Sequence, residues 1–237
     1  MTSARNAATQ GVALLLIAHA AHAADRLQLD PAGLSEPQQQ LARQTLDDVQ
    51  ALLPDGLLRA LPAQVRVSWR DDLPGQVHGR AFAGCIALRL DLLDDSRAGA
   101  RRARRSALVH ELTHVADRGG ANWSHSARWR DLAGWQRRPW HLGRGDNHFS
   151  DRSPDRYELT DPAEYLAVNA ERFVLDAEFA CRRPALAQWY QQHFGTPPSL
   201  PTAQCEGTVP LLQAEAEEGA ASLLQLDPAR VFAVDYL

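Results

Sequence analysis

The stretch that decides the fold and the chemistry of this chain is His110-Glu111-Leu112-Thr113-His114, an HExxH pentapeptide. On a helix, two residues four positions apart lie one above the other on the same face. Two imidazoles in that arrangement can hold one zinc ion, and a glutamate beside the first of them is placed to act as general base on a metal-bound water. We therefore predict a zinc site with His110 and His114 as ligands and Glu111 as a catalytic residue.

The motif lies in a predicted helix over about 97–118, which two glycines end. Before it, the patterns predict a capped helix from Ser35 to about Leu52, a strand over 65–69 and two strand-like pieces within 77–93. After it, we expect a helix from Asp161-Pro162 to about Asp176, a helix over about 210–225 and a strand-like end at 231–234. This order predicts an α+β fold: a small mixed sheet packed on the active-site helix, then a mostly helical C-terminal part.

Two segments next to the motif each allow two interpretations. The run Arg101-Arg102-Ala103-Arg104-Arg105 forms the first half of the motif helix, and it is either a solvated face, which we favour, or a patch for an anionic substrate. Residues 120–156 predict a long loop that either walls the cleft or packs its tryptophans under the surface. These are Trp123, Trp129, Trp135 and Trp140.

The N-terminus has the layout of a signal peptide. Arg5 is followed by the apolar run Val12–Ala18 and by the small-residue end Ala21-His22-Ala23. The run is too short for a spanning helix. We expect cleavage after Ala23, with an uncleaved anchor as the alternative, and one domain over 24–237. The protein is then exported, periplasmic or secreted, and not stably inserted in a membrane.

The net charge and the cysteines limit which binding partners and which cellular compartment we expect. The formal net charge of −4 gives no indication of a nucleic-acid partner. Cys181 and Cys205 flank a Pro-rich segment and can close a loop across it in an oxidising compartment. Cys85 lies in an apolar strand-like run, where we expect a buried thiol. The oligomeric state is left open.

A zinc site built on two histidines needs a third protein ligand. Gly120 stands where a third histidine in the H-x-x-G-x-x-H register would be, so that class is excluded. Glu164 and Glu171, seven residues apart on the predicted 161–176 helix, face the same way. We prefer Glu164, since small residues beside it let this helix approach the motif helix. Glu171 is the alternative ligand, or a hydrogen-bond acceptor for a ligand imidazole.

Asp117 lies one turn beyond His114. A ligand histidine usually donates its second N–H to a carboxylate or a carbonyl, and Asp117 is placed to accept it. An ordinary surface aspartate is the alternative. A carboxylate near the C-terminus of a helix is disfavoured by the helix dipole, which favours the functional interpretation.

The motif followed by Glu164-Tyr165-Leu166-Ala167 resembles the gluzincin metallopeptidases. Over about 105–185 it looks most like the branch that includes the catalytic domain of anthrax lethal factor, and like uncharacterised exported bacterial proteins. The resemblance implies a zincin-like fold, a Zn2+ cofactor and Glu164 as the third ligand. It also implies that Tyr157, seven residues before Glu164, assists the transition state, and it matches Asp117 to an aspartate of that branch.

Together these features predict a zinc-dependent peptidase acting on a peptide or protein substrate. Glu111 takes a proton from the zinc-bound water, and Tyr157, or failing it His141 or His148, hydrogen-bonds the developing oxyanion. The resemblance to zincin-like folds also implies that the strand at 85–91, which precedes the motif helix, edges the cleft and can pair with an extended peptide. Two alternatives remain open, a non-catalytic zincin-like module that binds zinc and a zinc amidase acting on a cell-wall amide. The intact Glu111 favours an enzyme.

Overall fold

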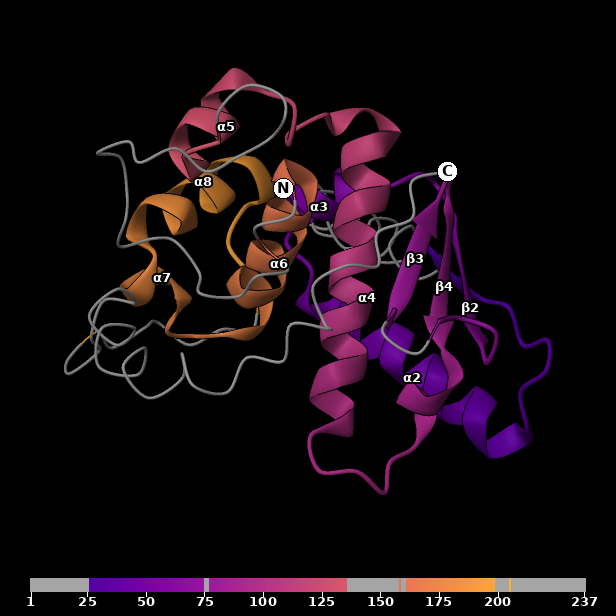
Figure 1. The fold of residues 1–237 in the computed structure, drawn as a ribbon. Helices are drawn as coiled ribbons and strands as arrows, with labels where there is room; N and C mark the ends of the chain where they lie inside the picture. Colours follow the sequence, from indigo (N-terminus) through magenta and orange to yellow (C-terminus); the bar gives the residue numbers. More distant parts are fainter. Residues whose placement is uncertain (1–25, 75–76, 136–157, 159–160, 199–204, 206–237) are drawn as a thin grey trace, which may run out of the picture.

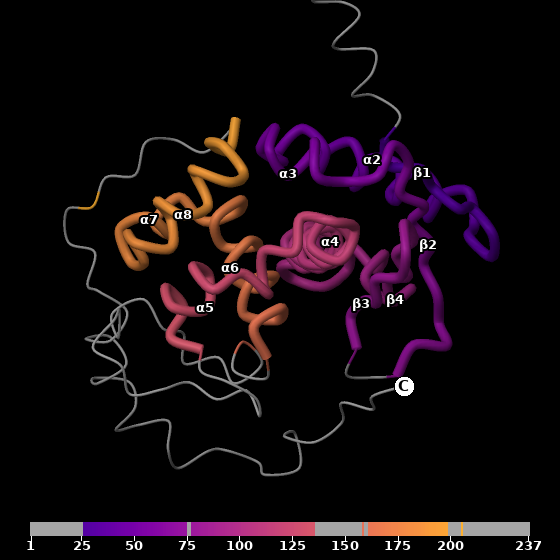
Figure 2. The backbone as a smooth tube through the Cα atoms, turned by 90° about the horizontal axis from the view of Figure 1, so that it is seen from above, coloured from indigo at the N-terminus to yellow at the C-terminus, as the bar shows by residue number. Residues whose placement is uncertain are grey.

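One helix, α4 (Ala100–Ala116), runs through the middle of the molecule, with a sheet on one side and helices on two others (Figures 1 and 2). The computed structural model describes residues 26–74, 77–135, 158, 161–198 and 205. Within them the architecture is mixed α+β, as predicted. The predicted helix over 210–225 and strand-like end at 231–234 lie outside the described residues.

The sheet has four strands in the order β1-β2-β4-β3. Their bounds are Leu27–Leu29 (β1), Val65–Arg70 (β2), Gly79–Phe82 (β3) and Cys85–Arg89 (β4). β1 and β4 pair with β2 in parallel, whereas β3 pairs with β4 antiparallel and forms one edge of the sheet. The strands predicted within 65–69 and 77–93 are confirmed. The chain beyond β4 differs from the alternating pattern, because Leu90–Leu93 form a 3-10 turn, η1.

Two helices precede β2 and cover α4 on a third side (Figure 2). α2 (Glu36–Leu52) begins as predicted, with a capping box in which the Gln38 side chain accepts the Ser35 N–H at 2.9 Å. α2 ends before Pro54, which is the N-cap of a further short helix, α3 (Asp55–Ala60), that the sequence patterns did not predict. Gly56 lets α3 pack tightly on α8, since a Cβ there would lie 2.5 Å from the His193 carbonyl oxygen.

α4 itself confirms the predicted motif helix. The helix does not simply stop at the two glycines. A π-helical turn, η2 (Asp117–Ala121), follows it directly. The turn closes with Gly120 at φ 133° and Asn122 at φ 52°, both in the positive-φ region that glycine and asparagine tolerate best. Every residue from Ala107 to Ala116 is buried.

The described elements after α4 are all helical, namely α5 (Ala127–Ala133), α6 (Pro162–Leu175), α7 (Phe179–Arg182) and α8 (Pro184–Phe194). α6 begins where the sequence predicts, because the Asp161 side chain caps it by accepting the N–H groups of Ala163 and Glu164 at 2.7 and 3.0 Å. α5 corrects the prediction of one long loop over 120–156, since Ser126 caps a short helix there.

The tryptophans of the 120–135 region pack between helices. Trp129 is fully buried, and its ring lies 4.5 Å from Trp189 and 5.8 Å from Tyr190 between centroids. Its indole N–H donates to the Pro162 carbonyl at 3.3 Å, which satisfies the polar group of a buried ring. Trp135 is buried as well. Of the two interpretations, the structure supports packing for these residues; Trp140 lies outside the described residues.

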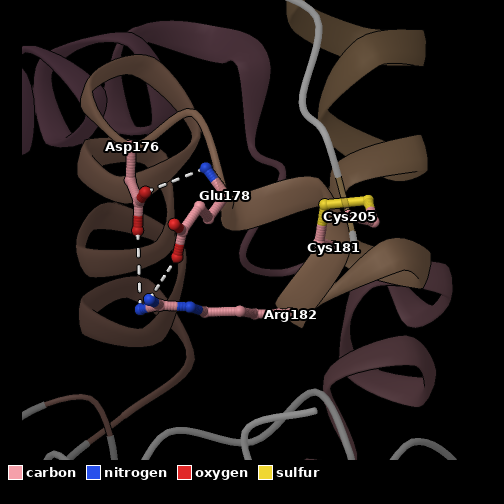
Figure 3. Close-up of a disulfide and its surroundings, with 5 residues drawn as sticks. All are labelled: Asp176, Glu178, Cys181, Arg182 and Cys205. Carbon is pink, nitrogen blue, oxygen red and sulfur yellow. Dashed lines mark hydrogen bonds and ion pairs between the residues drawn. A yellow bond between two sulfur atoms is a disulfide. The ribbon is translucent and has the colours of Figure 1, made fainter. Parts of the chain in front are cut away.

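A disulfide joins Cys181 to Cys205 and confirms the predicted loop closure (Figure 3). Beside it, Arg182 forms ion pairs with Glu178 and, at 3.9 Å, with Asp176. Cys85 is free and only partly buried. None of the described helices has both the length and the apolarity needed to cross a membrane.

Candidate metal centre

Three predicted ligands come together where α4 packs on α6. The Glu164 Oε2 atom lies 3.1 Å from the His110 Nε2 atom and 3.3 Å from the His114 Nε2 atom. The two Nε2 atoms are 3.1 Å apart. These spacings suit three atoms that share one ion at about 2.0–2.2 Å each. The described residues therefore include a His/Glu cluster that can hold a metal ion.

The cluster is set in the interior of the protein. His110 and His114 are 7% and 4% exposed, and the Glu164 side chain is 17% exposed. Ala167, one turn beyond Glu164, is fully buried, so α6 approaches α4 closely as expected. Asp161 already caps α6, which leaves the Glu164 carboxylate free to face the imidazoles.

Glu171 lies behind the first histidine rather than among the three ligand atoms. Its Oε1 atom is 2.6 Å from the His110 Nδ1 atom, and its other oxygen accepts the hydroxyl of Ser106. A carboxylate on Nδ1 holds that nitrogen protonated and turns Nε2 towards the cluster. Of the two roles predicted for Glu171, the geometry is that of the acceptor. Ser106, one helical turn before His110, was missed; its place at i−4 on the same face was the available signal.

These contacts change the pKa values of the groups in the cluster. Burial alone would lower the pKa of His110, but hydrogen bonds to Glu164 and Glu171 raise that pKa to about 10. Burial alone would raise the pKa of Glu164, but its hydrogen bonds to the two histidines hold it well below its usual range. The two carboxylates therefore favour the charged form of His110.

Glu111 faces the edge of the sheet beside the cluster. It is 6% exposed, and burial raises the pKa of its carboxyl. A Cβ on Gly79 would lie 2.8 Å from the Cγ and Oε1 atoms of Glu111, so the side chain of Glu111 fills the space that this glycine leaves. Gly79 is a site neighbour that the sequence analysis missed, because only the register of β3 on β4 brings it here.

Asp117 is buried and both of its oxygens contact Ser124. Oδ1 accepts the Ser124 N–H at 3.0 Å, and Oδ2 accepts the hydroxyl at 2.5 Å. In this position Asp117 closes the turn that follows α4. Its predicted contact with a ligand imidazole stays a prediction. The other predicted residues, Tyr157, His141 and His148, lie outside the described residues.

Comparison with known proteins assigns the family. A family model described as a domain of unknown function, DUF7844, matches residues 26–130 and 121–203. The chain belongs to the DUF7844 family. That match covers α4 and α6 and therefore the whole cluster. No solved structure matches the chain.

Named relatives of this DUF7844 protein are called Mlc titration factor A. The chain is 32% identical to the protein of that name from Salmonella agona over 165 residues, which are 60% of this chain and 59% of the relative. It is 31% identical to those of Salmonella arizonae and Salmonella enteritidis, covering 62% and 59% of them. The chain thus spans about three fifths of the length of these relatives.

These names correct the functional prediction. They are those of a titration factor and of a domain of unknown function, and neither is the name of a metallopeptidase. The resemblance to gluzincins, the hydrolase activity and the peptide or protein substrate are therefore not upheld, and neither are the zincin-like module and the amidase. The motif supplies two histidines that can hold a metal ion and a carboxylate beside them, and these do not by themselves specify a reaction. The signal peptide is not indicated by these names and lies outside the described residues.

Proposed function

We propose that this DUF7844 protein is a metal-dependent titration factor, which binds a macromolecular partner and holds Zn2+ at His110, His114 and Glu164. The name of the relatives supports the partner binding. The three ligand atoms, all within 4.8 Å of one another, carry the metal proposal. Two imidazole nitrogens and one carboxylate oxygen form a donor set that suits zinc.

The neighbours of the three ligands fit the same proposal. Glu171 would fix the ring of His110 in the tautomer that ligates through Nε2. Glu111, which is buried and whose pKa burial raises, lies within electrostatic reach of His110, His114 and Glu164. Tyr157 stays a proposed partner of the same site.

The metal would also hold the fold together at its centre. His110 and Glu164 are separated by 54 positions in the chain, and the first belongs to α4 and the second to α6. Ligands from two helices tie metal binding to their packing, because the site does not exist in the unfolded chain. We propose that the mixed sheet, its antiparallel edge strand β3 and these two helices form a zincin-like arrangement.

We further propose that the chain is exported and acts in the periplasm or outside the cell, as one domain over 24–237. The Cys181–Cys205 disulfide supports this, because such bonds persist in oxidising compartments. Cell fractionation with N-terminal sequencing tests it. The expected product begins after Ala23 and lies outside the cytoplasm; a full-length chain found only in the cytoplasm contradicts the proposal.

Partner capture tests the titration role. The zinc-loaded full chain, its chelator-treated form and Glu164→Ala are immobilised and exposed to purified Mlc from Salmonella agona, the source of a relative. We expect the zinc-loaded chain to bind, and Glu164→Ala to bind at least about tenfold more weakly, since the metal supports the fold. Glu178→Ala, at an exposed glutamate away from the cluster, is the matched control. Absence of binding by the zinc-loaded chain contradicts the titration role, and equal binding by all forms contradicts the need for metal.

A further inference from the structure

A second cluster of charged side chains lies along the other half of α4, where that helix faces α2. A cavity of about 230 Å3 opens there. Three arginines of the Arg101–Arg105 run line it, together with Gln44 and Asp48 from α2 and with Asp95. The run thus contributes to a cavity and is not only a solvated face.

Arg104 is the most buried member of this cluster, at 2% exposed. Its guanidinium donates to the Leu92 carbonyl at 3.1 Å and pairs with Asp95 at 2.7 Å. Its Nε atom is buried and has no hydrogen-bond partner in the described part of the chain. A buried donor on a charged group without an acceptor costs free energy.

Arg101 and Arg105 share a single carboxylate oxygen. Their NH2 atoms lie 2.8 and 2.7 Å from the Oδ2 atom of Asp48. The Nε atom of Arg105, like that of Arg104, is buried and unpaired within the described residues. Three guanidinium groups therefore line a cavity with two carboxylates, Asp48 and Asp95, and two buried donors remain without acceptors.

The position of the cluster on the helix adds to this excess of positive charge. The N-terminus of a helix carries a partial positive charge, which acidic residues usually offset. α4 has no acidic residue in its first turn, and its N-cap, Gly99, offers no side-chain cap. An anion in the cavity would supply the missing negative charge.

We propose that the cavity between α2 and α4 binds a phosphate-sized oxyanion, held by the guanidinium groups of Arg101, Arg104 and Arg105 that line it. Guanidinium groups match the geometry of phosphate oxygens and bind them by charge-assisted hydrogen bonds. The site is separate from the metal cluster, which is built from the other half of α4. It is independent of the proposed titration role.

Isothermal titration of the full zinc-loaded chain with inorganic phosphate, at constant ionic strength, tests the site. We expect saturable binding at one site per chain, and Arg105→Gln to weaken it about tenfold or more. Arg102→Gln is the matched control, because Arg102 is exposed, carries the same charge and does not line the cavity. It should change the affinity less than about twofold, since exposed charges are screened.

Asp48→Asn keeps the test decisive if Arg105→Gln unfolds. It removes the carboxylate that occupies two of the guanidinium groups, so phosphate should bind more tightly, an effect that unfolding cannot produce. Three results each overturn the proposal: no saturable binding to the folded wild-type chain, equal losses in Arg105→Gln and Arg102→Gln, or phosphate affinity that Glu164→Ala abolishes and Arg105→Gln leaves unchanged, which would place the anion at the metal centre.

Discussion

In α4, residues 100–106 and residues 107–116 lie in different surroundings although they share one helix. Of the first group only Arg104 is buried, and its arginines meet Asp48 and Asp95 in ion pairs with at least one partly exposed partner. The second group is buried throughout, and its histidines meet the glutamates of α6. Both halves thus place basic side chains against acidic ones from another part of the chain.

Both halves pair opposite charges, so it is burial that makes residues 107–116 a candidate metal centre. Pairs that water screens contribute about 1 kcal/mol or less and leave the arginines charged. In the interior the same pairing raises the pKa of His110 and holds that of Glu164 well below its usual range.

The largest effect is expected from removing a ligand in the buried half. His114→Ala should lower zinc affinity by more than about 100-fold, because losing a ligand costs more than losing a group behind one. Competition with a chromogenic chelator measures it. His193→Ala on α8 is the control, and an affinity equal to that of wild type would remove His114 from the site.

Next in size is the loss of the carboxylate behind His110. Glu171→Gln should weaken zinc binding about 10- to 100-fold, because the amide no longer accepts the His110 N–H as strongly. Glu178→Gln, an exposed glutamate on the same side of the chain, provides the baseline in the same assay. If the two variants bind zinc alike, the contact between Glu171 and His110 has no part in the site.

Zinc uptake should also release a proton. With its pKa raised to about 10 in the metal-free chain, against 6.5 for an unperturbed histidine, His110 is protonated at pH 8. Its charged form therefore stabilises the metal-free fold below about pH 6.5, and this contribution is lost as the pH rises towards 10. Titration of zinc in two buffers of different ionisation enthalpy should report about one proton released per zinc at pH 8. No release at that pH contradicts the proposed charge state.

The smallest effect belongs to the exposed half. Arg102→Glu should raise the free energy of unfolding by about 0.3–1 kcal/mol, because an acidic side chain in the first turn suits the helix dipole. Urea denaturation measures it, and zinc affinity should not change. A loss of zinc in this variant would mean that the two halves are not independent.

Local helix geometry is what made the centre predictable. The i, i+4 spacing of His110 and His114 and the Asp161-Pro162 start of α6 are properties of short stretches, so Glu164 could be preferred from the sequence. The disulfide followed from the positions of Cys181 and Cys205 around a Pro-rich segment.

Features that depend on distant contacts were not predictable in this way. The three residues of β1 are a strand only because they pair with β2. Pro54 and Pro184 stand at the start of α3 and α8, two helices that the sequence patterns did not predict. Gly79 meets Glu111 through strand register alone. The functional prediction was wrong for another reason. The same set of metal-binding side chains occurs in proteins with several different functions.

The most direct test of a metal centre at α4 and α6 is the zinc content of the purified full chain, measured by mass spectrometry beside Glu164→Ala and Glu171→Ala. We predict about one zinc per wild-type chain. Glu164→Ala should lose most of it, and Glu171→Ala should lose less, since only Glu164 reaches both Nε2 atoms. A wild-type chain that binds no zinc, or a greater loss in Glu171→Ala than in Glu164→Ala, would contradict the account.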